Sequence, residues 1–142
     1  MSDDAIPAAT LVVWRDTANG PEILVVERSA SMTFAAGAIV FPGGRVDAAD
    51  RALAATLGRP DDAAKVTAIR ETIEETGIAP ALMPSIEPAA GRAIQAALHE
   101  GGDFAALLDA HGLELDLDAL TPFARWMPAA TSGDRVAVTA SN

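Results

Sequence analysis

The stretch RETIEETGI, Arg70–Ile78, places three glutamates and one arginine directly before a glycine. Upstream of it, Asp61 or Asp62 offers a helix start, because aspartate commonly caps the first turn of a helix. Gly77 stands where many helices end, since glycine adopts the left-handed backbone conformation of a terminating turn without strain. The stretch therefore predicts the C-terminal half of a helix that begins near residue 62.

This helix is predicted to have two faces of different chemistry. Three aliphatic residues recur at the i, i+3, i+7 spacing of a buried stripe: Val66, Ile69 and Ile73. Successive helical residues rotate by about 100°, so Glu71, Glu74 and Glu75 share one arc on the opposite side. A divalent cation would offset their mutual repulsion, because hard ions prefer carboxylate oxygen. A solvated acidic face is the alternative for such a cluster taken alone.

A second motif, FPGG at Phe41–Gly44, follows the apolar run Gly37–Val40. This pattern is typical of a strand that runs into a tight turn. Paired glycines also let the backbone approach a ligand closely, so the carbonyl of Gly44 can join a metal shell. A turn with no other duty is the alternative. The order of the two motifs, glycine pair first and acidic helix second, favours a functional site.

Together the two motifs resemble the Nudix hydrolase family. Gly44 would open the family motif, and Arg70–Ile78 closes it in full register. Three departures are present. Asp50 stands at the glutamate position in the middle of the motif, residues 51–69 form an unusually long spacer, and Thr72 takes an aliphatic position. The spacer predicts a short inserted helix, stopped by a glycine and a proline.

The resemblance implies an α/β (α+β) fold, a Nudix-type mixed sheet flanked by helices. We expect a single domain over 1–142, with the motif at 44–78, a helical insertion at 51–62 and a helical segment at 85–112. The residue pattern adds individual elements to this fold. These are a hairpin of strands Thr10–Arg15 and Glu22–Arg28 turning at Asn19–Pro21, helices Glu87–His99 and Phe104–His111, and a strand at Leu120–Met127.

The same resemblance implies metal-dependent hydrolysis of a nucleoside diphosphate linked to another moiety. Glu71, Glu74 and Glu75, with the Gly44 carbonyl, would hold Mg²⁺ or Mn²⁺. Glu74 and Glu71 would be catalytic, with Glu71 as a further ligand or as the base that takes a proton from water. Arg70 would pair with a glutamate of the motif and fix its rotamer.

A further resemblance narrows the substrate. Arg28, Ser29, Gly37 and Phe41–Gly44 match the segment before the motif in coenzyme A diphosphatases, although Thr33 stands where that pattern has a second arginine. Coenzyme A or an acyl-coenzyme A is therefore the leading substrate, with dinucleotides and nucleotide sugars also open. Three residues are expected to bind it: Arg28 and Arg45, whose guanidinium groups suit phosphate, and Phe41.

A binding or regulatory module with the same fold and little or no catalysis is the alternative function. Asp50 and Thr33 favour this alternative because both depart from the family patterns. The intact set of Glu71, Glu74 and Glu75 favours an enzyme, because a module released from catalysis has no evident need for such a repulsive cluster.

Composition limits the partners. The chain has 142 residues with 20 acidic against 10 basic, and its net charge of −10 disfavours nucleic acid as a partner. A small diphosphate, bridged by metal ions, is expected instead. The absence of cysteine predicts a cytoplasmic location, and the N-terminal residues do not resemble a signal peptide. No apolar run approaches the roughly 20 residues of a membrane helix.

The C-terminal end departs from the branch that the chain resembles, and it reads as if truncated. Only Arg135–Thr139, in the final stretch PAATSGDRVAVTASN, has the character of a strand. We expect either that this segment pairs into the sheet or that a second copy of the chain covers an open edge as a homodimer. A disordered polar tail is the alternative.

Overall fold

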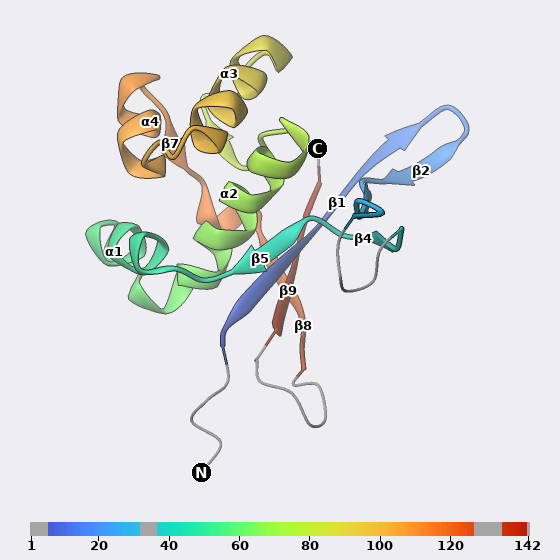
Figure 1. Cartoon of the computed structure of the whole chain (residues 1–142), viewed down its shortest axis with the longest axis horizontal. Coiled ribbons are helices and arrows are strands. Elements are labelled where there is room, and N and C mark those ends of the chain that lie inside the picture. The colour runs from blue at the N-terminus through green and yellow to red at the C-terminus, as the bar shows by residue number, and fades with distance from the viewer. Residues whose placement is uncertain (1–5, 32–36, 127–134, 142) are drawn as a thin grey trace.

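The computed structural model describes residues 6–31, 37–126 and 135–141, with side chains described as far as residue 125. The main sheet contains β1 (Ala8–Thr17), β2 (Gly20–Ile23), β5 (Gly43–Arg45), β8 (Thr121–Trp126) and β9 (Arg135–Ser141). Two small sheets pair β3 (Val26–Glu27) with β4 (Ile39–Val40) and β6 (Leu82–Met83) with β7 (Glu114–Leu115). The helices are α1 (Ala48–Thr56), α2 (Ala63–Thr76), α3 (Pro88–His99) and α4 (Phe104–Ala110), with short 3-10 turns at Pro60–Asp62 and Leu117–Ala119. These helices gather on one side of the main sheet (Figure 1).

The main sheet is mixed, which confirms the predicted fold class. Its strand order is β2-β1-β9-β8, and β5 pairs with β1 beside β2. The pairing of β1 with β9 is parallel, whereas the other pairings in this sheet are antiparallel. β1 is therefore the central strand, because its N-terminal half carries β5, its C-terminal half carries β2, and its opposite edge carries β9.

The predicted C-terminal strand is confirmed by its pairing. β9 runs beside β1 from the pair Ala8 and Arg135 to the pair Trp14 and Ser141, and it also pairs with β8. The first of the two alternatives for this segment is thus correct, and the homodimer stays a prediction. β8 becomes the edge of the sheet, where Pro122 lacks a backbone donor and a bulge interrupts the register before Ala124.

Two turns were predicted wrongly. The hairpin turns at residues 18–19, and Gly20 and Pro21 already pair with β1 in strand β2. Gly43 and Gly44 do not form a tight turn but belong to β5, where they pair with Thr10 and Ala9. A side chain at Gly43 would collide with the Ala9 carbonyl, so the close approach of two strands, and not a turn, requires this glycine.

The helix predictions are largely confirmed. α3 and α4 fall within one residue of the predicted boundaries, and Gly77 ends α2 in the left-handed conformation. The inserted helix begins earlier than predicted, at Ala48. A capping box fixes this start, in which the backbone N–H groups of Asp47 and Asp50 each bond the other's carboxylate.

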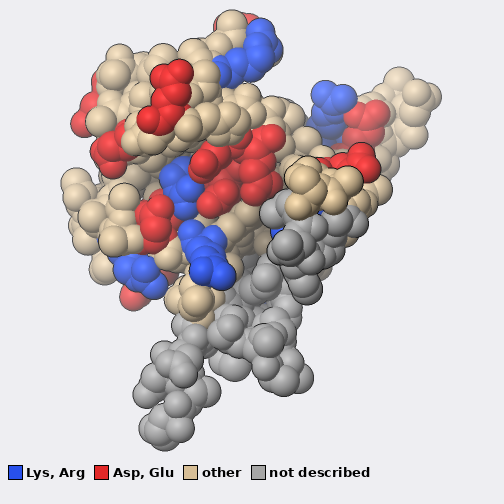
Figure 2. All heavy atoms as spheres, viewed as in Figure 1, with Lys and Arg blue, Asp and Glu red and all other residues tan. Residues whose placement is uncertain are grey.

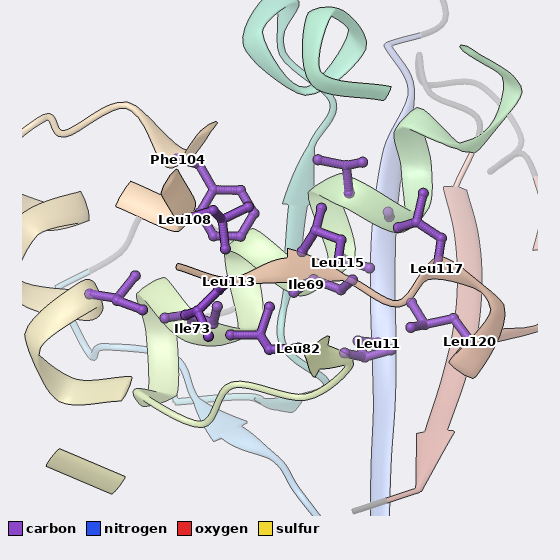
Figure 3. Close-up of a cluster of buried hydrophobic side chains, with 14 of the residues drawn as sticks. Leu11, Ile69, Ile73, Leu82, Phe104, Leu108, Leu113, Leu115, Leu117 and Leu120 are labelled. Carbon is purple, nitrogen blue, oxygen red and sulfur yellow. The ribbon is translucent and has the colours of Figure 1, made fainter. Parts of the chain in front are cut away.

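The core lies between α2 and the sheet and continues under α3 and α4. Val66, Ile69 and Ile73 are fully buried, which confirms the predicted stripe. They pack in one cluster with Leu11 of β1 and with leucines that follow α4 (Figure 3). This packing turns the opposite face of α2, with its glutamates, toward solvent and toward β5. No helix in the described part of the chain combines the length and apolar character that a membrane crossing requires.

Candidate active site

The site is built around a buried ion pair between α1 and α2. Asp50 is 1% exposed, and Arg70 donates to both of its oxygens, from Nε to Oδ1 at 2.8 Å and from Nη2 to Oδ2 at 2.9 Å. Thr67 adds a third bond, from Oγ1 to Oδ2 at 2.7 Å. The pKa of Arg70 is raised, because these contacts with Asp50 outweigh the loss of hydration. Arg70 is thus held charged in one fixed orientation.

The other end of the Arg70 guanidinium reaches two glutamates. Nη1 donates to Glu71 Oε1 at 3.1 Å and to Glu74 Oε2 at 3.0 Å. Nη2 also donates to the backbone carbonyl of Arg45 at 3.3 Å, which ties α2 to β5. Arg70 therefore links the α1–α2 contact to the acidic face.

Gly44 lies directly against Glu71. A Cβ atom at Gly44 would overlap the Glu71 carboxylate, so a larger residue here would displace the Glu71 side chain from its present position. Because β5 pairs with β1, the sheet determines how closely the Gly44 backbone approaches α2. The structure therefore brings together the five residues assigned to catalysis and metal binding: Gly44, Arg70, Glu71, Glu74 and Glu75.

Two of the carboxyl groups have raised pKa values. Burial raises the pKa of Glu71, and the charges of Glu74 and Asp50 add to the effect against the opposing influence of Arg70. Loss of hydration, then repulsion from Glu71, raises the pKa of Glu75 to about 7. The Glu75 side chain as a whole is exposed, but its carboxylate accepts a backbone hydrogen bond from Gly43, next to α2. The site thus holds more negative charge than its own cations neutralise.

The chemical type of these groups, carboxylate and carbonyl oxygen, suits a divalent metal ion. Carboxylate oxygens are the ligands that Mg²⁺ prefers, and a cation would offset the repulsion between glutamates that adds to the effect of burial on the two pKa values. Within the described residues, however, no group of three acidic, histidine or cysteine side chains converges closely enough to form a finished metal site. Arg70 accounts for part of this, because its Nη1 already lies between Glu71 and Glu74.

A cleft of about 870 Å³ adjoins the acidic face. Arg28, Arg45 and Phe41, the residues assigned to substrate binding, all line it together with Gly44 and Glu75. Its walls also carry exposed aliphatic side chains, among them Val25 at 47% and Ile39 at 70% exposure. Thr33, which stands at the second arginine position of the substrate motif, lies outside the described residues. The cleft therefore combines cations, apolar walls and one glutamate of the acidic face.

Acidic and basic side chains lie next to one another on the surface around the acidic face of α2. Figure 2 shows acidic side chains gathered over α2, with basic side chains directly beside them. A smaller hollow of about 170 Å³ lies between Trp14, Ile23 and Ile78, apart from the acidic face. Its lining has none of the glutamates of α2, so the larger cleft is the better candidate for the active site.

Sequence reasoning missed how Asp50 and Thr67 contribute. Asp50 is a departure from the family motif and is followed by a long spacer, yet it is the main partner of Arg70. Thr67 stands one turn before Arg70 on α2 and bonds the same carboxylate. Two signals were available: the D-x-x-D pattern of the capping box at Asp47 and Asp50, and the i, i+3 spacing of Thr67 and Arg70.

Comparisons with known proteins agree with this geometry. A family model described as the NUDIX domain matches residues 5–130. A NUDIX hydrolase from Alicyclobacillus acidocaldarius has a similar crystal structure, with a TM-score of 0.80 and 36% identity over 98% of this chain and 70% of its own. A MutT/nudix family protein from Enterococcus faecalis shares the fold, with a TM-score of 0.58 and 12% identity over 99% of this chain and 38% of its own. The comparison with curated proteins found no match.

Proposed function

The chain belongs to the Nudix hydrolase family, and on that premise we propose that its substrate is a coenzyme A or acyl-coenzyme A type diphosphate. As a member of the family it is a pyrophosphohydrolase, an enzyme that cleaves phosphorus-containing acid anhydrides. This membership favours an enzyme over the non-catalytic module. The substrate class rests on the composition of the cleft.

One observation carries the proposal: the cleft joins guanidinium groups, aliphatic walls and the acidic face in one continuous surface. Arg28 and Arg45 suit the oxygens of a diphosphate, because a guanidinium donates to two oxygens at once. Val25, Ile39 and Phe41 would cover an apolar part of the same molecule. Nucleotide sugars, which are polar on both sides of the diphosphate, would leave these apolar side chains exposed.

Nudix hydrolases generally use a divalent metal such as Mg²⁺ or Mn²⁺. In this chain Glu71, Glu74 and Glu75, with the carbonyl of Gly44, would hold it. When bound, the ion supplies Lewis-acid activation of a phosphoryl oxygen and of the attacking water. The proposal leaves open which of the two metals this chain prefers.

The proposed roles in proton transfer and in positioning belong to the side chains around Arg70. Oε1 of Glu71 accepts from Arg70, so its second oxygen, Oε2, would either bind the metal or take the proton of the attacking water. Arg70 keeps Glu74 in one rotamer, since its Nη1 lies 3.0 Å from Oε2. Asp50 and Thr67 in turn stop Arg70 from moving away with a bound anion.

A hydrolysis screen tests the substrate. With Mg²⁺ and with Mn²⁺, we expect coenzyme A and acyl-coenzymes A to be cleaved faster than NADH, ADP-ribose or diadenosine polyphosphates. Arg28→Ala should then lower kcat/KM for coenzyme A about tenfold or more, as expected for a lost hydrogen bond between charged groups. Arg15→Ala, which removes an exposed arginine outside this cleft, is the matched control. Rapid cleavage of ADP-ribose or NADH with coenzyme A untouched would contradict the proposal.

A further inference from the structure

The C-terminal end of α2 has a backbone acceptor that its own helix does not satisfy. Gly77 donates its N–H to Ile73 O at 2.8 Å, which closes the last regular turn. Ile78, whose N–H would come next, donates instead to Thr76 Oγ1 at 3.0 Å. The carbonyl of Glu74 is therefore left without a helical donor, as is usual for the last carbonyls of a helix.

α3 supplies two donors to this one carbonyl. Gln95 Nε2 donates to Glu74 O at 3.1 Å, and His99 Nε2 lies 2.6 Å from the same oxygen. Sequence analysis had left His99 without a functional role. Both bonds come from side chains of another helix, so they fix the end of α2 relative to α3 as well as completing its hydrogen bonding.

A stripe on α3 makes this contact possible. Gly91, Gln95 and His99 follow one another at intervals of four residues, so they lie on one face of the helix. Gly91 is buried against the backbone carbonyl of Gly77, where any side chain would collide with it. The glycine lets α3 approach the end of α2, and the next two turns then place their side chains at Glu74.

The clamped carbonyl belongs to Glu74, one of the glutamates of the acidic face. The Glu74 carbonyl and the Glu75 N–H share one peptide plane, which is rigid. Holding that carbonyl from outside the helix therefore fixes where both glutamate side chains begin. Arg70 fixes the Glu74 carboxylate from the opposite side, through Nη1 at 3.0 Å.

We propose that Gln95 and His99 are positioning residues, which clamp the Glu74–Glu75 peptide and so set the spacing of the carboxylates that bind the divalent cation. This inference rests on the part of the proposed function that assigns Glu74 and Glu75 to the metal. It does not depend on which diphosphate is the substrate. The clamp is distinct from simple packing because it acts on one peptide and not on the apolar core.

Binding of Mn²⁺ to the whole chain, followed by electron paramagnetic resonance and by calorimetry at 10 °C, tests the clamp without any substrate. The double variant Gln95→Ala/His99→Ala should raise the dissociation constant for Mn²⁺ about tenfold, as for other residues that orient metal ligands. Each single variant should give part of that loss. His99 is exposed, so His99→Ala is expected to fold even if the double variant does not.

Two further variants separate positioning from stability. His99→Gln replaces the imidazole N–H with an amide N–H of similar reach, so it should keep most of the Mn²⁺ affinity of the parent, whatever its effect on the thermal midpoint. His111→Ala removes an exposed histidine at the end of α4 and should leave Mn²⁺ affinity unchanged. A clamp that serves stability alone would lower the thermal midpoint of His99→Ala while its Mn²⁺ affinity stayed at the parent value, and that result would overturn the proposal.

The outcome also separates this inference from the substrate assignment. A parent that binds Mn²⁺ but does not hydrolyse coenzyme A, together with a clamp variant that binds Mn²⁺ about tenfold more weakly, would leave the clamp standing and remove the proposed substrate. A parent chain that binds no Mn²⁺ would overturn the clamp, because there would be no cation for it to position.

Discussion

Two carboxylates of this site, Asp50 and Glu75, have opposite surroundings. Asp50 is 1% exposed, yet Arg70, Thr67 and a backbone N–H satisfy its oxygens, so burial there is fully compensated. Glu75 faces the cleft, and loss of hydration with repulsion from Glu71 raises its pKa to about 7. The comparison teaches that the degree of burial alone does not show whether a carboxyl group has enough hydrogen-bond donors and opposite charges around it.

The largest effect should come from breaking the buried pair. Asp50→Ala would leave the charge of Arg70, whose side chain is 12% exposed, without its main partner. We expect a loss of about 3–5 kcal/mol in the free energy of unfolding, the usual result when one member of a buried ion pair is removed. Urea denaturation of parent and variant measures it. A loss below about 1 kcal/mol would mean that Asp50 behaves like a surface carboxylate.

A substitution on the acidic face should have little effect on stability and a large effect on the rate of hydrolysis. Glu74→Gln leaves the buried stripe of α2 untouched, so the fold should remain intact. Turnover should fall by on the order of 10²-fold or more, roughly 3 kcal/mol of transition-state stabilisation. Steady-state kinetics with the best substrate of the screen would show this, and a variant as fast as the parent would refute the metal assignment.

The raised pKa of Glu75 predicts a pH dependence in the metal-free protein. The folded state holds a proton on Glu75 up to about pH 7, above the ordinary value of 4.5, so it binds protons more tightly than the unfolded state. The contribution of Glu75 to stability should therefore be fully present below the ordinary value and should be lost as pH rises through about 7. Thermal midpoints in EDTA across this range measure the effect. Glu75→Gln should flatten the profile, and an unchanged profile would assign the dependence to Glu71 or another group.

The smallest effect should come from an ion pair of similar geometry on the surface. Arg15 Nη2 lies 2.7 Å from Glu22 Oε2, but the two side chains are 63% and 55% exposed. Glu22→Gln should change the free energy of unfolding by less than about 1 kcal/mol, because solvent already screens this pair. The same urea experiment gives the value, and a loss similar to that of Asp50→Ala would remove the distinction between the two regions.

Sequence alone predicted the parts of the fold that depend on local pattern. The buried stripe of α2, the boundaries of α3 and α4 and the glycine end of α2 all follow from periodicity and capping. The pairing of Gly43 and Gly44 with β1 did not follow, because a glycine pair fits a turn and a close strand contact equally well. Only the partner strand, far away in the sequence, distinguishes these two structures.

In the candidate site, too, the sequence predicted what depends on local pattern and did not predict the contacts between distant residues. The glutamates of α2 could be placed on one face because their spacing is fixed by the helix. A glutamate of the motif was predicted as the partner of Arg70, but the contact with Asp50 was not, because the 51–69 spacer separates the two residues in the sequence. Gln95 gave no signal, since a glutamine on an alanine-rich helix is ordinary until the end of α2 is seen beside it. Contacts between elements, and not the elements themselves, were what the sequence left out.

The parallel pairing of β1 with β9 has a consequence for how the protein is made. β1 leaves the ribosome well before its neighbour across the sheet, β9, which begins only at Arg135. Until β9 emerges, that edge of β1 exposes unpaired backbone groups beside apolar side chains, a surface that invites association with other chains. Contacts between such distant residues also slow folding, because a long loop must close before they form. Newly synthesised chains should therefore need chaperone protection of β1 until β9 has been made.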